Sequence, residues 1–171
     1  VLGSTMPTWY GGWNNTVSYK NFDLNVFFRF SGGNKIMNAS RQSALFNMDF
    51  SNNGTEILGR WISPEQPGDG MTPKIGYGDA SSLFNDGYTD SHFVESGNYL
   101  KLSTLALGYT LPKAVVSKLN MTKIRFYVQG QNLLTITGYS GLDPETNSRL
   151  GVDWNGMPQQ RSFTFGANIT F

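Results

Sequence analysis

The sequence predicts an all-β protein made of antiparallel strands, each with two chemically different faces. In the stretch 161–171, apolar side chains take every odd position from Phe163 to Phe171, with small polar residues between them. Side chains on a strand alternate between its faces, so this stretch carries an apolar stripe and an uncharged polar stripe. The composition agrees, because 39% of the 171 residues are hydrophobic but only 15% are charged, against about 25% in typical domains.

The period of two recurs in four more stretches. The predicted strands cover about 10–20, 22–30, 99–111, 123–135 and 161–171. In the third strand, Leu100 and Leu102 have the opposite parity from the leucines that follow, which indicates a β-bulge. The second strand places one aromatic residue, Phe27, on its polar face.

Long loops separate some of these strands. The stretches 31–97 and 136–160 are rich in glycine, proline and asparagine and lack the period of two. Short helices are expected within the first loop at about 35–48 and, with Thr55 as a cap, at about 56–62. The other connections, Lys20–Asn21 and 112–122, are short.

The alternation of short and long connections is typical of outer-membrane β-barrels, which have short periplasmic turns and long extracellular loops. Ten residues rising ~3.3 Å each and tilted ~45° span roughly 23 Å, close to the ~25 Å apolar band of such barrels. No apolar run approaches the ~18 residues of a membrane-spanning helix. Five strands cannot close a barrel, so the chain is expected to be part of a larger one.

A soluble, aromatic-rich β-sandwich that binds carbohydrate is the alternative. The same apolar stripes would then face a packed protein core instead of lipid. This alternative predicts a chain that folds alone in buffer, whereas the barrel segment needs detergent and the rest of its barrel.

Several other functions are excluded or disfavoured. A net charge of +1 with no basic tract argues against nucleic-acid binding. The absence of cysteine excludes disulfides and thiolate metal sites. His92 is the only histidine and no nucleophile-elbow motif is present. Asp143 and Glu145 match neither a calcium loop nor a glycosidase pair. We therefore expect no enzyme, no catalytic residue, no metal and no cofactor.

The sequences of the predicted strands resemble the carboxy-terminal sequences of the SusC/RagA family of TonB-dependent outer-membrane transporters. The resemblance covers GNYLKLSTLALGYTLP at 97–112, RFYVQGQNLLTITGYSGLDPE at 125–145, RSFTFGANITF at 161–171, PTWYGGWNNTVSYKNFDLNVFFRFSGG at 7–33, and Arg60-Trp61 followed by Pro64-Glu65. It implies an antiparallel transmembrane barrel of 22 strands, of which this chain supplies about the last five. The loops at 31–97 and 136–160 would be extracellular.

The resemblance also implies a function and partners. It implies import of oligosaccharides or peptides across the outer membrane of a Gram-negative, Bacteroidota-like bacterium. The expected partners are the rest of the barrel and its plug, a SusD-like surface lipoprotein acting as a lid, TonB through a box far upstream, the barrel-assembly machinery and outer-membrane lipid. No nucleic-acid partner is expected.

Three groups of residues are candidates for functional roles. Loop aromatics that could contact ligand or lid are Trp61, Tyr77, Tyr88, Tyr139 and Trp154. Residues on the polar strand faces that would face the lumen are Arg29, Lys101, Arg125, Gln129 and Gln131. Residues of the terminal strand that would form the assembly signal are Phe163, Phe165, Ile169 and Phe171.

Overall fold

The computed structural model describes residues 2–42, 52–74, 91–145 and 150–171, and these fall into two compact units. The sheet unit comprises Pro7–Gly33, Asn98–Gly138 and Gln159–Phe171. The loop unit comprises Val1–Met6, Asn34–Gly97 and Tyr139–Pro158. Each unit is described by itself.

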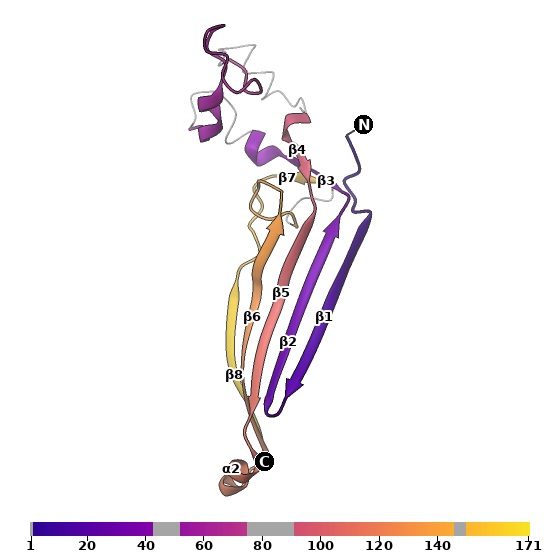
Figure 1. Ribbon diagram of the computed structural model, residues 1–171, viewed down its shortest axis with the longest axis vertical. Helices are drawn as coiled ribbons and strands as arrows, with labels where there is room; N and C mark the ends of the chain where they lie inside the picture. The colour runs from indigo at the N-terminus through magenta and orange to yellow at the C-terminus, as the bar shows by residue number, and fades with distance from the viewer. Residues whose placement is uncertain (1, 43–51, 75–90, 146–149) are drawn as a thin grey trace. The chain divides into compact units, whose positions relative to one another are not determined.

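The sheet unit is one antiparallel sheet of five long strands, which lie side by side in Figure 1. The strands are β1 (Trp9–Tyr19), β2 (Phe22–Gly32), β5 (Tyr99–Thr110), β6 (Lys123–Thr137) and β8 (Ser162–Thr170), in the order β1-β2-β5-β6-β8. The predicted antiparallel fold class is confirmed. Each strand boundary lies within two residues of its predicted position. The sheet is open, with β1 and β8 as its edge strands.

A β-bulge in β5 explains the change of leucine parity. Leu102 pairs with Phe28 of β2 and Thr104 pairs with Phe27, so Ser103 is an extra residue between two adjacent pairs. A second irregularity faces it in β6, where Asn132 has a positive φ of 53°. Because of the extra residue, the leucines before and after the bulge share one face of the sheet.

Glycines make room for bulky neighbours on both faces. A Cβ built on Gly12 would lie 2.8 Å from the ring of Phe27, and one on Gly11 would lie 2.8 Å from the ring of Phe30. Phe27, the aromatic on the polar parity, therefore lies over a glycine of the edge strand. Such an arrangement covers an otherwise exposed backbone.

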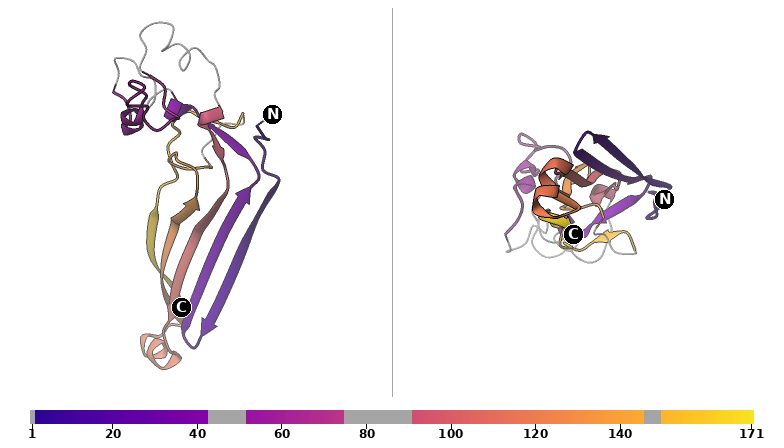
Figure 2. Two further views of the ribbon diagram at one scale, coloured as in Figure 1. Left: turned by 45° about the horizontal axis from the view of Figure 1, so that its top comes forward. Right: turned by 90° about the horizontal axis from the view of Figure 1, so that it is seen from below.

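Two short connections close one end of the sheet. Lys20 and Asn21 join β1 to β2, and Lys20 has the positive φ of 54° that a tight hairpin turn requires. Helix α2 (Lys113–Val116) and the 3₁₀ turn η4 (Ser117–Leu119) join β5 to β6. Helix α2 lies beside the C-terminus in every view (Figures 1 and 2). Among the described residues, no helix is both long enough and apolar enough to span a bilayer.

The loop unit contains a second, small sheet. Its strands are β3 (Lys35–Asn38), β4 (Val94–Ser96) and β7 (Val152–Asp153), in the order β4-β3-β7, with β3 and β7 parallel. The 3₁₀ turns η2 (Thr55–Gly59) and η3 (Ser91–Phe93) complete it. Phe93 is fully buried, with Met37 and Ile57 packed against it.

Two predictions for this unit need correction. The expected helix at about 35–48 is only partly present: residues 39–42 are helical, but residues 35–38 form strand β3, because they pair with β4 and β7 and this pairing overrides local propensity. Residues 43–48 lie outside the described residues. Thr55 is the first residue of η2 instead of its cap. The cap position is Gly54, and no side chain hydrogen-bonds there.

Candidate functional site

The apolar face of the sheet is bounded by two rows of aromatic side chains. At the end with the short connections, Tyr19, Phe22, Tyr109 and Phe126 lie in register across β1, β2, β5 and β6. The rings of Phe22 and Tyr109 are 4.6 Å apart. At the other end, Trp9 lies 6.2 Å from Phe30. Four residues farther along β1, Trp13 stacks on Phe28 at 5.8 Å.

The spacing of the two rows is informative. Trp9 and Tyr19 are the first and last residues of β1. Ten residues rising ~3.3 Å each and tilted ~45° separate the rows by roughly 23 Å. Barrels in outer membranes have an apolar band about 25 Å tall with aromatic girdles at both interfaces.

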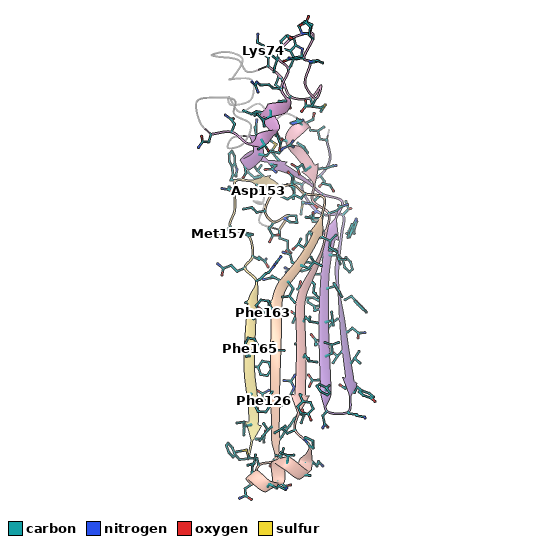
Figure 3. All side chains as sticks on the ribbon, turned by 60° about the vertical axis from the view of Figure 1, so that its left-hand side comes forward. Lys74, Phe126, Asp153, Met157, Phe163 and Phe165 are labelled. Carbon is teal, nitrogen blue, oxygen red and sulfur yellow. The ribbon has the colours of Figure 1, made fainter. Side chains whose placement is uncertain are left out.

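Between the rows, the apolar face consists of aliphatic and aromatic side chains that the sheet unit leaves uncovered. The exposed residues there are Val17, Leu24, Leu105, Leu107, Leu134, Phe163 and Phe165, and Ile169 lies on the same face just beyond the row at the short connections. Phe165, for example, is 78% exposed. The side chains of Phe163 and Phe165 stand on β8 and that of Phe126 on the neighbouring β6 (Figure 3). A continuous, exposed apolar face of this size indicates that it contacts lipid or another protein.

The five predicted lumen residues share the opposite, polar face. The pairing register places Arg29, Lys101, Arg125, Gln129 and Gln131 there together. Arg29 lies directly opposite Lys101, and Lys101 is only 1% exposed. Gln131 accepts a hydrogen bond from Ser162 at 3.3 Å.

An ion pair crosses three strands on this polar face. Arg125 of β6 donates to both carboxylate oxygens of Asp23 in β2, at 2.9 and 2.5 Å. The pair passes over Gly108 of β5, where a Cβ would lie 2.5 Å from Asp23 Oδ1. Arg125 also lies 5.4 Å from the centroid of the Tyr127 ring, and that ring lies over Gly166 of β8. This contact series joins four of the five strands on one face.

The four candidate assembly-signal residues are all accessible. Phe163, Phe165 and Ile169 project from the apolar face of β8, and Phe171 follows the strand with 84% of its surface exposed. They are not covered by a second layer in the sheet unit.

The loop unit contains a cavity of about 270 Å³. It is lined by Asn38, Ser40, Arg41, Glu56, Ser140, Gly141, Leu142, Asp153, Asn155 and Gly156. Arg41 forms an ion pair with Glu56 at 2.8 Å and with Glu95 at 3.5 Å. The hydrogen bonds that Arg41 donates to Glu56 and the negative charge of both carboxylates raise the pKa of Arg41. Glu95 in turn accepts hydrogen bonds from Asn38 and Ser140. Ion pairs and hydrogen bonds within the loop unit therefore fix the side chains of Arg41, Glu56 and Glu95.

The predicted ligand or lid aromatics have different environments. Trp154 is 71% exposed, and Trp61 is half-buried with Lys74 Nζ 5.8 Å from its ring centroid. Tyr139 does not fit the prediction, because it is only 6% exposed and its hydroxyl donates to Asp153 at 2.6 Å. Burial and the Asp153 carboxylate raise the pKa of Tyr139 well above its usual value. Tyr77 and Tyr88 lie outside the described residues.

His92, Asp143 and Glu145, the residues considered for catalysis, form contacts that stabilise the local fold. Nε2 of His92 lies 3.3 Å from Nη2 of Arg41. Asp143 is buried and accepts the amide N–H of Glu145 at 3.0 Å, as a turn residue does. Across the described parts of the chain, no three His, Cys, Asp or Glu side chains gather as metal ligands do.

The Arg41 cluster was missed by sequence reasoning. Its members Arg41, Glu56 and Glu95 come from three segments far apart in the chain. No local pattern reports such a contact, because it depends on how β3, β4 and η2 pack.

The known proteins whose sequences are similar to this chain include several TonB-dependent receptors. No protein-family model matches the chain. TonB-dependent receptors P3 and P26 of Formosa agariphila are each 32% identical to it over its full length. TonB-dependent receptor SusC of Bacteroides thetaiotaomicron is 26% identical over 94% of it. The chain spans only 15–18% of the length of these relatives.

Solved structures give the same result. Two structures of the RagAB peptide importer, in the open-open and closed-closed states, match 97% and 99% of the chain. Their TM-scores are 0.80 and 0.82, each with 26% sequence identity. The matches cover 17% and 18% of those chains.

Proposed function

Because the chain belongs to the SusC/RagA family of TonB-dependent receptors, we propose that it forms part of the wall and rim of an outer-membrane transporter that imports oligosaccharides or peptides. The relatives are named as receptors and a peptide importer. In this proposal the chain is the carboxy-terminal part of the barrel, about five of 22 strands, and it carries out no chemistry of its own. The remaining strands, about seventeen, continue the sheet from its edges β1 and β8.

The observation that carries this proposal is the uncovered apolar face between two aromatic rows. Its leucines and phenylalanines are exposed although the opposite face is polar. Such a face is costly in water and stable against acyl chains. A soluble sandwich would need a second sheet over Phe163, Phe165 and Ile169, and these residues remain exposed.

The polar face supports a hydrated interior. Arg29, Lys101 and Arg125 would line the lumen or brace the plug, together with Gln129 and Gln131. Of the two cations that lie opposite each other, Lys101 is buried and Arg29 only half-buried, so Arg29 is the better placed to meet the water of the lumen. The short connections then lie at the periplasmic rim and the loop unit at the extracellular rim.

The partners follow from the same proposal. A SusD-like lipoprotein would dock over the loop unit, where Trp61 and Trp154 are the described candidates for contact, with Tyr77 and Tyr88 as further candidates. TonB would energise transport through a segment far upstream. Phe163, Phe165, Ile169 and Phe171 would be recognised by the barrel-assembly machinery.

A deletion in the full-length receptor tests the role of the loop unit. Residues 33–97 are replaced by Asn-Gly, which suits a two-residue hairpin joining Gly32 and Asn98, the positions that follow the Ser31–Tyr99 pair in the β2–β5 register. The ends to be joined are close, because the amide of Gly33, which follows Gly32, donates to Asn98 Oδ1 at 2.8 Å. We expect normal amounts of heat-modifiable barrel in the outer membrane but loss of nutrient uptake and of lid binding.

The matched control places the same Asn-Gly turn at Lys20–Asn21, on the opposite rim. This variant should keep both barrel assembly and uptake. Full uptake with unchanged lid affinity in the deletion would remove the proposed role of the loop unit. Uptake that is lost equally in the control would show that the turn replacement itself is harmful.

A further inference from the structure

The end of the sheet with the short connections, which we call the short-turn rim, concentrates positive charge. Its residues are 19–24, 108–126 and 166–171. Five cationic side chains lie there, Lys20, Lys113, Lys118, Lys123 and Arg125, against a single acidic side chain, Asp23. In the whole chain the two signs are nearly balanced, at 13 Lys and Arg and 12 Asp and Glu. The rim is therefore basic in an otherwise neutral chain.

The four lysines of the rim are available to a partner. All four are exposed, and the ion pairs among the described residues do not involve them. Asp23 is already engaged by Arg125. Lys20 Nζ lies 5.3 Å from the ring centroid of Tyr19, a member of the aromatic row. A cation at an aromatic row suits the boundary between acyl chains and headgroups.

The α2–η4 connection adds an apolar contact to this charge. Val115 and Leu119 are one helical turn apart and exposed, Leu119 by 54%, and Lys118 adjoins them. The connection is well anchored, because Val116 is buried and its carbonyl accepts the Met121 amide at 3.3 Å.

Backbone hydrogen bonds hold the rim together. The amide of Thr110 donates to Asn21 of the hairpin, and the amide of Thr122 donates to Thr170 of β8, each at 2.8 Å. The lysines of the hairpin and of the α2–η4 connection therefore belong to one continuous edge.

We infer that the short-turn rim binds anionic phospholipid headgroups of the adjoining leaflet. The inference rests on the proposed function, which places the apolar face in the membrane and this rim at the periplasmic leaflet. Clusters of lysine next to a lipid-facing surface attract anionic headgroups, and exposed apolar side chains beside them insert at the acyl boundary. Lys20, beside the aromatic row, and Lys113 and Lys118, in the α2–η4 connection, can extend their stems toward the apolar band while their ammonium groups meet the phosphates. Lys123 shares the polar face with Arg125 and adds only its charge to the rim.

Spin-labelled lipids in reconstituted membranes test this inference. The full-length receptor is inserted in bilayers, and the motionally restricted fraction is measured for labelled phosphatidylglycerol and for labelled phosphatidylcholine. We expect the wild type to prefer phosphatidylglycerol, and the preference to fall as ionic strength rises. In K113Q/K118Q the preference should fall by about twofold or more.

The matched control removes two exposed lysines of the loop unit, in K35Q/K74Q. This variant should keep the wild-type preference. No preference in the wild type, a preference insensitive to salt, or an equal loss in both variants would overturn the inference. A wild-type receptor that inserts as a heat-modifiable barrel but shows no preference contradicts the lipid site alone, whereas failure to insert contradicts the proposed function itself.

Discussion

At the scale of single residues, the same residue type serves opposite purposes in the two units. Aromatic side chains on the apolar face of the sheet are exposed, as Phe165 is, whereas Tyr139 in the loop unit is buried. The Tyr139 hydroxyl and the Gly156 amide both donate to the buried carboxylate of Asp153. Tyr139 therefore joins the start of the segment 139–145 to residues 153–156 of the loop unit.

Replacing Tyr139 by phenylalanine tests this role. The change leaves the ring in place but removes one donor from a buried carboxylate, which costs about 1–3 kcal/mol. We expect faster hydrogen exchange at the amides of residues 139–141 and 153–156 in the full-length receptor, with the barrel intact. Trp154→Ala, at an exposed position of the same segment, should leave the exchange unchanged. Wild-type exchange in Tyr139→Phe, with impaired uptake, would instead favour a ligand contact.

Asp69 gives a prediction about pH. The Thr72 hydroxyl and the amides of Thr72 and Met71 donate to its carboxylate at 2.7–2.8 Å. These hydrogen bonds hold the pKa of Asp69 below its usual value. A carboxyl whose pKa is lower in the folded state stabilises the fold above its unfolded pKa, near 4, and this stabilisation is lost as the pH falls through the folded pKa.

The turn at 69–72 should therefore open in acid. Hydrogen exchange at Met71 and Thr72, corrected for intrinsic rates, should be slow at pH 6 and increase below about pH 4. Asp69→Asn should remove this pH dependence, while Glu65→Gln, at a nearby exposed carboxylate, should retain it. Identical pH profiles in Asp69→Asn and the wild type would contradict the assignment.

The elements that could be predicted from sequence are those long enough to display their period. The five strands of the sheet have nine or more residues each and were all predicted. The strands β3, β4 and β7 have two to four residues, too few to show an alternation. They exist because distant segments pair, which no local pattern reports.

The bulge in β5 shows how strongly the two faces constrain this element. The bulge at Ser103 returns Leu105 and Leu107 to the face of Leu100 and Leu102. The side chain of Ser103 is buried, and its hydroxyl has no hydrogen-bond partner in the described part of the chain. The residue is thus needed for its backbone position and not for its side chain.

An insertion tests this constraint. One alanine added between Ala106 and Leu107 would reverse the faces of all residues on one side of it. The leucines Leu100, Leu102 and Leu105 would then move to the polar face and Lys101 to the lipid face, where its charge costs about 0–1 kcal/mol more because it lies at the level of the Phe30 boundary row. We expect loss of the heat-modifiable barrel. The same alanine added after Asn120, in the connection between β5 and β6, should be tolerated, and Ser103→Ala should assemble normally. Normal assembly of the β5 insertion would show that the faces are not constrained.

At the scale of the whole molecule, the proposed role as a barrel segment depends on what covers the apolar face. The sheet has two open edges, one polar face and one apolar face, and the whole chain spans only 15–18% of the length of its relatives. The sequence alone indicated this incompleteness, because five strands cannot close a barrel. The Arg41 cluster and the burial of Tyr139 could not be predicted, because both depend on contacts between distant segments.

The most direct measurement is the accessibility of four consecutive positions in β5. The chain contains no cysteine, so single cysteines at Thr104, Leu105, Ala106 and Leu107 can each carry a nitroxide label in the reconstituted full-length receptor. Lipid-soluble oxygen should relax the labels at 105 and 107 most strongly, and a water-soluble nickel chelate those at 104 and 106. Labels at 105 and 107 that neither reagent reaches would place the apolar face against protein and contradict the account.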